Sequence, residues 1–439
     1  MNKNMTREAA IPLSTVPLAL EPLMKGVPPE MLGLSREDIA ATRFSVINKN
    51  VPLPAAILKR SVLQQNSRWM RDYVAQAGAS IAPHGKTSMS PELFELQQRD
   101  GCWGLTLASY QQVRVARHYG VSRIILANEA IGELELDYYL EQIRDDSAFD
   151  FYCYVDSEQG VRKIIQQARS ANIGRPLNLL LELGYAGGRA GCRSLEDALR
   201  VAHAVQEGGD CIQLRGVSGF EGLYQGLKGE DRLTLVEDFL KLIVKTAFAC
   251  DEAKLFGAGE ILLSAGGSSY YDVVTRMFGS VRLSGPVRVV TRSGCYLTHD
   301  SGMYRELQSE VLARDGHARH LVGHLDAALE VWAQVLSIPE PELIVVSAGK
   351  RDFGIDAGMP VPVRLARMEA GLLTLPPGCV VVAVSDHHAH IKVPMGHQIR
   401  HGDLIGLGVS HPCTTFDKWR VIYMVNDDYT IVDIAQTHF

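Results

Sequence analysis

The sequence predicts an α/β protein in which a (β/α)8 barrel is followed by a smaller, mainly antiparallel β domain. Short apolar runs alternate with stretches of helical spacing over residues 44–300, which is typical of buried parallel strands joined by helices. After about Gly294 short strands punctuated by glycine and proline replace this pattern. The length of 439 residues suffices for a barrel of about 250 residues and an attached module. A doubly wound open sheet is the second architecture that the alternation allows.

The chain begins with a segment in which proline recurs and no hydrophobic period is sustained. This predicts an extended arm with at most short helical turns. The predicted division is an arm over residues 1–43, a barrel over 44–300 and a β domain over 301–439, with about ten residues of tolerance at the second boundary.

Eight short β-prone or apolar runs are the candidate barrel strands. They cover residues 79–83, 102–108, 123–128, 150–155, 176–183, 212–220, 260–265 and 287–292. Helical spacing lies between them, for example over 110–119, 158–171 and 233–253. In the β domain the candidate strands cover residues 343–347, 361–365, 380–384, 404–409, 421–425 and 430–434.

Composition and charge exclude several classes of protein. Hydrophobic residues make up 46% and charged residues 21% of the chain, and the net charge is -6, so neither disorder nor a nucleic-acid footprint is expected. The eight cysteines are scattered singly and form no disulfide framework. Arg7 and Glu8 interrupt any signal-peptide core, and no apolar run reaches the ~18 residues of a membrane span. We therefore expect a soluble, cytoplasmic protein without a membrane or nucleic-acid partner.

Lys86 lies where the first predicted strand ends, after Gly85 and before small hydroxyl residues. A lysine at a barrel mouth is costly to desolvate as a cation, so its amine tends to become nucleophilic. That is what a Schiff-base lysine requires. A solvated loop lysine is the alternative.

A glycine- and serine-rich loop follows the seventh predicted strand. Ser264, Gly266, Gly267 and Ser268 combine close backbone approach with donors for an anion, although many such loops are plain turns. Because barrel phosphate sites often follow strands 7 and 8, this loop and Lys86 would supply the two anchors that pyridoxal 5'-phosphate needs. Further candidate contacts to the cofactor, at the ends of other strands, are Tyr185, Arg189, Tyr224 and Tyr296.

A second cluster lies in the predicted β domain. His411 and Cys413 are two residues apart, so on an extended segment both side chains share one face. Imidazole and thiolate together favour zinc over magnesium or calcium. His388 is a possible third metal ligand or a substrate contact, and an open coordination position would remain.

These pieces resemble the D-serine dehydratase-like and D-threonine aldolase-like family of pyridoxal phosphate enzymes. The resemblance runs from about Phe44 to the C-terminus and is carried by the motif that includes Lys86 (residues 83–87) and by residues 264–269, 292–296, 386–388 and 411–415. The chain departs from the family where Ser88 and Met89 replace a usual His-Lys pair. It departs again where Asp386 is followed by two histidines, whereas the family usually has two acidic residues followed by His-Gly.

The resemblance implies a fold type III, alanine racemase-type TIM barrel, a bound pyridoxal phosphate, a zinc ion and a homodimer. It also implies a small D-amino acid substrate with a β-hydroxyl group. In the family a His-x-Cys metal pair accompanies zinc dehydratases and His-x-Asp accompanies aldolases, so Cys413 favours dehydration of a substrate such as D-serine or D-threo-3-hydroxyaspartate to an oxo acid and ammonia. Retro-aldol cleavage to glycine and an aldehyde, racemisation, and non-catalytic carriage of the cofactor are the alternatives.

Overall fold

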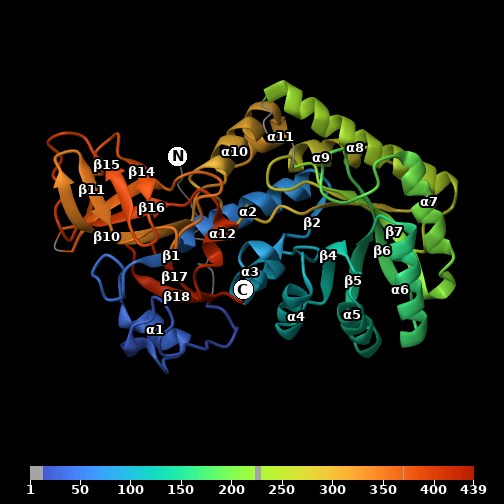
Figure 1. Ribbon diagram of the computed structural model, residues 1–439, viewed down its shortest axis with the longest axis horizontal. Coiled ribbons are helices and arrows are strands. Elements are labelled where there is room, and N and C mark those ends of the chain that lie inside the picture. The colour runs from blue at the N-terminus through green and yellow to red at the C-terminus, as the bar shows by residue number, and fades with distance from the viewer. Residues whose placement is uncertain (1–12, 223–228, 369) are drawn as a thin grey trace, which may run out of the picture.

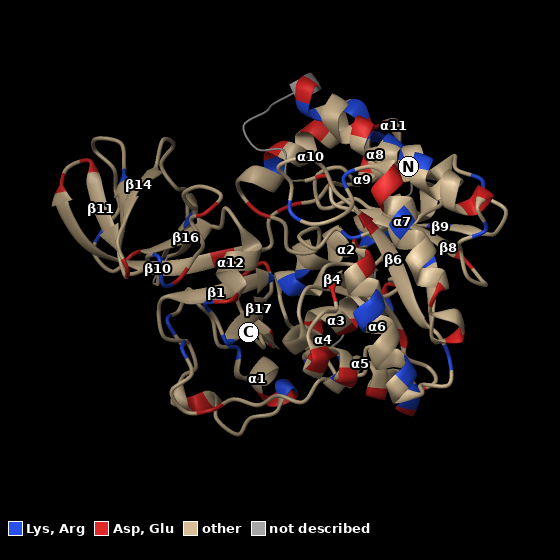
Figure 2. Ribbon diagram, turned by 45° about the vertical axis from the view of Figure 1, so that its right-hand side comes forward, with Lys and Arg blue, Asp and Glu red and all other residues tan. Residues whose placement is uncertain are grey.

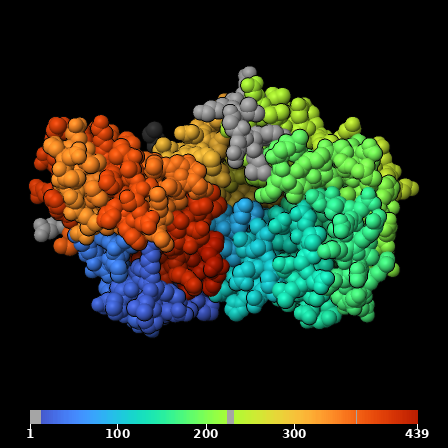
Figure 3. Space-filling model, in the orientation of Figure 1, coloured from blue at the N-terminus to red at the C-terminus, as the bar shows by residue number. Residues whose placement is uncertain are grey.

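The computed structural model describes residues 13–222, 229–368 and 370–439. Two lobes lie side by side (Figure 1): a helix-rich lobe around a parallel sheet, and a β-rich lobe that contains both the N-terminal and the C-terminal parts of the chain. The space-filling view shows the C-terminal segment, in red, between the N-terminal segment and the first part of the barrel (Figure 3).

The helix-rich lobe is built on an eight-stranded, all-parallel sheet. Its strands are β2 (Ser80–Ile81), β3 (Leu105–Leu107), β4 (Arg123–Glu129), β5 (Asp150–Val155), β6 (Leu177–Leu183), β7 (Ile212–Gly219), β8 (Ile261–Ala265) and β9 (Val287–Thr291), in the order β2-β9-β8-β7-β6-β5-β4-β3. The two end strands are joined by hydrogen bonds from the Trp103 amide to the Ile81 carbonyl at 2.8 Å and from the Thr106 amide to the Pro83 carbonyl at 2.9 Å. The sheet therefore closes, and the predicted barrel is confirmed.

Helices cover the outside of this barrel (Figure 1). They are α2 (Arg60–Gln76), α3 (Pro91–Arg99), α4 (Tyr110–His118), α5 (Glu133–Asp145), α6 (Glu158–Ala171), α7 (Leu195–Gln206), α8 (Gly229–Glu252) and α9 (Tyr271–Gly279). Ser109, Ser157 and Ser194 cap α4, α6 and α7, each accepting a hydrogen bond from an amide of the first turn, which fixes where these helices begin. Lysine and arginine are interspersed with aspartate and glutamate over this surface (Figure 2).

The β-rich lobe contains a ten-stranded sheet. Its strands are β1 (Ala55–Lys59), β10 (Leu329–Glu340), β11 (Leu343–Val346), β12 (Val361–Arg367), β13 (Gly371–Leu373), β14 (Val380–Val384), β15 (Ala389–Lys392), β16 (Leu404–Gly408), β17 (Val421–Val425) and β18 (Ile431–Gln436). All but one of their pairings are antiparallel; the exception joins β1 to β17. The mainly antiparallel character is as predicted.

The strand β1 departs from the predicted division of the chain. Residues 55–59 were expected in the barrel segment, yet β1 pairs with β10 on one side and with β17 on the other. Ala55, Ile57 and Leu58 are fully buried there. A buried strand has the same short apolar sequence in either sheet, so the local sequence of residues 55–59 does not indicate which sheet they join.

The arm packs on the same lobe. Met31 and Ile39, the latter from α1 (Arg36–Thr42), are buried in one cluster with Tyr423 and Ile431. Arg36 donates to Glu92 of α3 and to Asp433 of β18, both at 2.6 Å, and so ties the arm to both lobes.

The remaining helices are α10 (Met303–Arg314), α11 (Gly316–His320), α12 (Pro412–Phe416) and the short η1 (Pro29–Met31), η2 (Gly85–Thr87) and η3 (Gly209–Cys211). In the described part of the chain no helix is both long and apolar enough to cross a membrane.

Candidate active site

Lys86 lies in η2, directly after the carboxyl end of β2, and its side chain is exposed at the barrel mouth. The preceding Gly85 has no room for a side chain, because an added Cβ would lie 2.9 Å from both Leu107 and Phe94. The loop is therefore pressed against β3 and α3. This packing holds the lysine where the sequence predicted it.

His84 contributes an imidazole beside this lysine. Burial lowers the pKa of His84 well below its usual value, and the charges of Lys86, Arg292 and Arg189 act in the same direction. The buried Nδ1 atom of His84 has no hydrogen-bond partner. A buried polar atom without a partner is costly, so this nitrogen fits a site that receives a ligand.

Arg292, at the end of β9, is buried and held from three directions. It donates to Ser264 Oγ at 2.7 Å, to Ser218 Oγ at 3.2 Å and to the Gly219 carbonyl at 2.7 Å. The Ser264 hydroxyl in turn donates to the Val290 carbonyl. Ser264 was predicted to bind phosphate, but its hydroxyl positions Arg292 instead, because it lies inside the strand rather than in the loop after it.

The predicted phosphate loop already binds an anionic group of the protein. The amides of Gly266 and Gly267 donate to the two carboxylate oxygens of Glu221 at 3.0 and 2.8 Å, and Glu221 is fully buried. Ser268 Oγ accepts a hydrogen bond from the Cys295 amide. The two amides predicted to bind a phosphate therefore hold a carboxylate of the protein, and sequence reasoning missed Glu221.

The ends of β9 and β2 approach each other closely beside this loop. An added Cβ at Gly294 would lie 2.5 Å from Thr87 Oγ1 and 2.8 Å from the His84 carbonyl oxygen. Gly294 is therefore required for the close packing of the lysine loop against the end of β9.

The four remaining cofactor candidates differ in placement. Arg189 is close enough to His84 for its charge to lower the pKa of that ring. Tyr185 packs edge-on against Phe239 of α8, with 5.3 Å between ring centroids. Tyr224 lies outside the described residues. Tyr296 was predicted to cap the phosphate; its side chain is buried in a core cluster.

The metal pair predicted from the distant end of the chain meets the lysine loop. Cys413, in α12, has its Sγ atom 3.6 Å from Oγ1 of Thr87, the residue after Lys86. His411 precedes the same helix. Residues more than 320 positions apart in the sequence thus form one site between the two lobes.

Asp356 orients the imidazole of this pair. Its carboxylate lies 2.6 Å from His411 Nδ1 and also accepts from Thr414 Oγ1 at 2.6 Å. Hydrogen bonding to Cys413, aided by Asp356, raises the pKa of His411 to about 9. A carboxylate on one ring nitrogen leaves the other for a metal, as in many metal sites. No motif in the sequence indicated Asp356.

Two further groups complete the surroundings of Cys413. Cys295 Sγ lies 3.7 Å from Cys413 Sγ, and hydrogen bonding between the sulfurs raises the pKa of Cys295 and lowers that of Cys413. Proximity to the Cys295 sulfur, together with burial, raises the pKa of Tyr304, in the first turn of α10.

His388 lies exposed in the turn between β14 and β15. Within residues 13–222, 229–368 and 370–439 no three His, Cys, Asp or Glu side chains form a group that could hold a metal.

A pair of carboxyl groups lies at the ends of β4 and β6. Burial, together with a hydrogen bond to Glu129, raises the pKa of Glu182 to about 8. Arg189 and Arg292 oppose this shift. The same two arginines act on His84, so the carboxyl pair shares the barrel mouth with the lysine loop.

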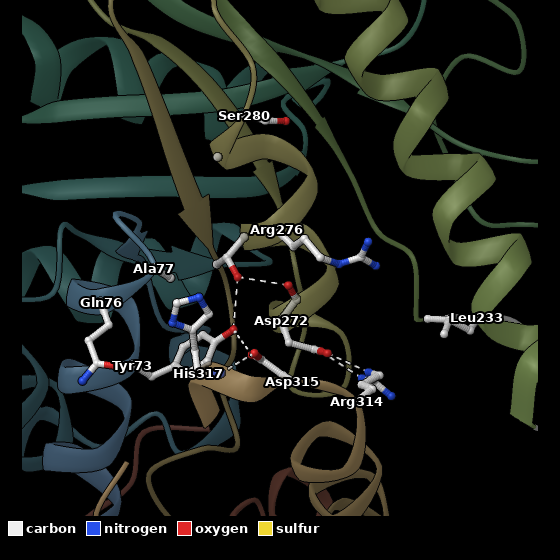
Figure 4. A pocket seen from close by; sticks show the side chains of 12 residues that line it. Tyr73, Gln76, Ala77, Leu233, Asp272, Arg276, Ser280, Arg314, Asp315 and His317 are labelled. Carbon is white, nitrogen blue, oxygen red and sulfur yellow. Dashed lines mark hydrogen bonds and ion pairs between the residues drawn. The ribbon is translucent and has the colours of Figure 1, made fainter. Parts of the chain in front are cut away.

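Another cavity, of about 510 Å³, lies away from this mouth among α2, α9 and α11. Figure 4 shows its side chains paired with one another: Tyr73 Oη donates to Asp315 at 2.9 Å, and Arg314 donates to Asp272 at 2.6 Å. No residue predicted for the cofactor or the metal lines it. Its polar groups hold α2, α9 and α10 together.

Comparison with known proteins places the chain among relatives of known activity. A family model described as "Putative serine dehydratase domain" matches residues 328–425, which include the metal pair. The chain is 23% identical over 322 residues to 3-hydroxy-D-aspartate aldolase of Paracoccus denitrificans (strain Pd 1222), covering 71% of this chain and 75% of that protein. It is also 23% identical over 393 residues to D-threonine aldolase of an Arthrobacter species, covering 86% and 90%.

Solved structures agree on the fold. The D-threonine aldolase of Filomicrobium marinum superposes with a TM-score of 0.72 at 20% identity, covering 88% of this chain and 95% of that one. The D-threo-3-hydroxyaspartate dehydratase of Delftia sp. HT23 superposes with a TM-score of 0.69 at 18% identity, covering 90% and 99%. A cysteine-to-alanine variant of D-threo-3-hydroxyaspartate dehydratase is described as metal-free. Alanine racemases superpose as well, with a TM-score of 0.58 for one of them. The fold is therefore an alanine racemase-type barrel followed by a β domain, and the suspected resemblance is confirmed.

Proposed function

We propose that the chain is a pyridoxal phosphate- and zinc-dependent lyase, because residues 328–425 match a family model described as "Putative serine dehydratase domain" and the fold is of the alanine racemase type. The proposed reaction is dehydration of a D-β-hydroxy amino acid, such as D-serine or D-threo-3-hydroxyaspartate, to an oxo acid and ammonia. One observation carries the proposal: Cys413 lies 3.6 Å from Thr87, which brings the His411–Cys413 pair beside Lys86.

The residues at the mouth fit pyridoxal phosphate. Lys86 would hold the aldehyde carbon. The amides of Gly266 and Gly267, which donate to the Glu221 carboxylate in this structure, would hold the phosphate in its place. The unpartnered Nδ1 of His84 and the fixed Arg292 offer polar contacts for the ring. When bound, this cofactor acts as an electron sink that acidifies the bonds at Cα of an amino acid attached to it.

The residues at the α12 end fit a zinc ion. His411 and Cys413 supply imidazole and thiolate donors, which zinc prefers, and Asp356 fixes the imidazole. With two protein ligands, coordination positions remain for water or for the substrate hydroxyl. A zinc ion there would assist departure of the hydroxyl as a Lewis acid.

The chain's own groups then divide the work. The Nζ atom of Lys86 is the base that accepts the Cα proton, since it lies exposed at the mouth beside the proposed metal site. The anionic cofactor would be surrounded by the positive charges of Arg189 and Arg292 and by the imidazole of His84. Thr87, buried between the lysine and Cys413, keeps the two halves of the site in register.

Retro-aldol cleavage is the second candidate, because both curated relatives described above are aldolases. It differs in which bond at Cα breaks. An aldolase would release glycine and an aldehyde, and a dehydratase would release ammonia and an oxo acid. The thiolate of Cys413 favours dehydration.

A screen of D-amino acids with ammonia and aldehyde readouts, with and without a chelator, tests the proposal. We expect ammonia from a β-hydroxy substrate, lost on chelation and restored by zinc. Glycine and an aldehyde as the products would establish the aldolase. Release of neither from any β-hydroxy D-amino acid by cofactor- and zinc-loaded protein would overturn both.

The cofactor assignment has its own test. Borohydride should fix the cofactor on Lys86 and bleach an absorbance at roughly 410–420 nm that is typical of such an imine. Lys86→Ala should abolish this band. Lys241→Ala, on the exposed face of α8 where Lys241 pairs with Asp238, should leave it intact. An unchanged band in Lys86→Ala would exclude Lys86 as the anchor.

We further propose that the protein is a homodimer in which each β domain lies near a barrel mouth, as the resemblance implies. Such an arrangement would let His388, exposed in this chain, face a substrate. Light scattering on the cofactor-loaded protein should give twice the mass of 48.2 kDa; a monomeric mass would contradict this.

A further inference from the structure

The sulfurs of Cys295 and Cys413 form a contact that the proposed reaction does not use. They lie 3.7 Å apart. Cys295 is in the turn after β9 and Cys413 is in α12, 118 positions along the chain. All eight cysteines are free thiols. A disulfide joins its sulfurs at about 2.05 Å, so closing this pair requires the two sulfurs to approach by less than 2 Å.

We propose that Cys295 and Cys413 form an oxidation site, at which a peroxide converts the two thiols into a disulfide when the metal is absent. Cys295 thereby acts as the resolving thiol for Cys413. Only the protection by metal rests on the proposed function, since the disulfide depends on the two thiols alone.

The balance of the reaction is simple. One sulfur, most readily that of Cys413, which is less buried than Cys295, attacks a peroxide oxygen, giving a sulfenic acid and water from hydrogen peroxide. The Cys295 sulfur then attacks that sulfenic sulfur, forming the S–S bond and releasing a second water. The two thiols lose two electrons and two protons, and the peroxide receives them.

The surroundings favour a disulfide over further oxidation. Cys295 is only 3% exposed, so it is shielded from bulk oxidant but lies in contact with Cys413. Thr87 Oγ1, within 3.6 Å of Cys413 and 4.0 Å of Cys295, flanks the pair. A neighbouring thiol captures a sulfenic acid before it reaches the irreversible sulfinic state.

Metal binding and the disulfide exclude each other, because a sulfur in a disulfide is no longer a thiolate ligand. The proposed metal ligands are His411 and Cys413. In the described part of the chain no third His, Cys, Asp or Glu side chain joins these two in a group that could hold a metal. A metal held by two protein ligands leaves more readily than one in a closed four-ligand site. Each departure would expose Cys413 to oxidation, and metal would protect it.

The test oxidises full-length protein with hydrogen peroxide, once after chelator treatment and once with zinc added. In the metal-free sample we expect a mass loss of about 2 Da, with peptides containing Cys295 and Cys413 cross-linked. Zinc should suppress the cross-link at least tenfold. A thiol reductant should restore zinc uptake, measured by metal analysis after gel filtration.

Variants separate a resolving role from a structural one. Cys295→Ser should give no cross-link and should carry Cys413 to the sulfinic acid, a gain of about 32 Da that reductant does not reverse. Cys102→Ser removes a half-buried thiol in the loop before β3 and should behave as the unmodified chain. Should Cys295→Ser fail to fold, peptide mapping of the unmodified protein still decides the matter.

Two results would overturn the proposal: sulfinic acid at Cys413 in the unmodified metal-free protein without a link to Cys295, or a disulfide joining other cysteines. Failure of the metal site on which the proposed function depends would look different. Zinc would then fail to bind and to protect, while the cross-link would still form.

Discussion

A carboxylate behind an imidazole decides which ring nitrogen is left for a metal, and Asp356 has this role for His411 at 2.6 Å. Asp356→Asn should therefore weaken zinc binding by about 10- to 100-fold, as loss of such partners does elsewhere. Competition against a chelator of known affinity measures this.

The matched control for that variant is Asp145→Asn. Asp145 is an exposed carboxylate on α5 that pairs with Arg144 at 2.8 Å, so its replacement should leave zinc affinity unchanged. Equal affinities for the unmodified chain and Asp356→Asn would show that Asp356 does not position the ligand.

Glu182 should make stability depend on pH. Its pKa is raised to about 8 from the ordinary value of 4.5, so between these values the folded chain retains a proton that the unfolded chain has lost. The free energy of unfolding then falls as pH rises across this window, and the loss is complete above pH 8. In Glu182→Gln the amide stays neutral, so urea unfolding should show a shallower fall between pH 5 and 8. An unaltered slope would mean that Glu182 is ionised throughout.

At the residue scale, sequence reasoning found the groups that carry a motif and missed those that do not. Lys86, His411 and Cys413 were identified from their spacing and the chemistry of their side chains, and the structure places them together. Tyr296 lies in the turn after β9, where no sequence period predicts the direction of a side chain. Asp356 and Cys295 became recognisable only once folding brought them to His411 and Cys413.

At the scale of elements, the eight barrel strands could be predicted because each is covered on both faces and is therefore a short apolar run. In the β domain, β10, β13 and β15 were missed, and β10 is the longest of the three. This strand has 12 residues, with a buried first half and a more exposed second half that pairs with β11 across two register shifts. Because its two halves differ in burial, β10 has no single hydrophobic period from which a strand could be predicted.

A buried ion cluster ties three elements together, and it should be costly to break. Arg36 of α1 lies 2.6 Å from both Glu92 of α3 and Asp433 of β18. Arg36→Ala would leave two buried carboxylates without a counter-charge, so the free energy of unfolding should fall by about 3–5 kcal/mol. Chemical denaturation followed by circular dichroism measures the change.

An exposed ion pair on α6 provides the comparison. Arg162 and Glu158 are one helical turn apart and both exposed, so Arg162→Ala should cost only about 0.3–0.5 kcal/mol. Similar costs for the two variants would show that burial adds nothing to the Arg36 cluster.

At the scale of the whole molecule, the chain crosses from the β domain to the barrel and back again. The strand β1 enters the β sheet first, the barrel follows, and β10 and β17 later close on either side of β1. The two lobes are therefore not consecutive segments. The hydrophobic pattern of the sequence could locate the boundary between barrel and β domain near residue 300. It could not show that residues 55–59 pair with β10 and β17, because these partners lie hundreds of residues further along the chain.

This topology predicts that residues 301–439 do not fold alone. Without β1, the facing edges of β10 and β17 would lose their backbone partners, and the sites filled by Ala55, Ile57 and Leu58, all fully buried, would be empty. Unpaired strand edges and cavities of this size favour aggregation and loss of cooperativity. We expect the isolated 301–439 fragment to lack a cooperative urea transition. A matched fragment, with residues 13–60 joined to 301–439 through a glycine- and serine-rich linker, should regain one, since it restores β1 and the arm that packs on β17 and β18. A cooperative transition in the isolated fragment, at the same midpoint as in the joined one, would mean that β1 is an accessory strand rather than the centre of the sheet.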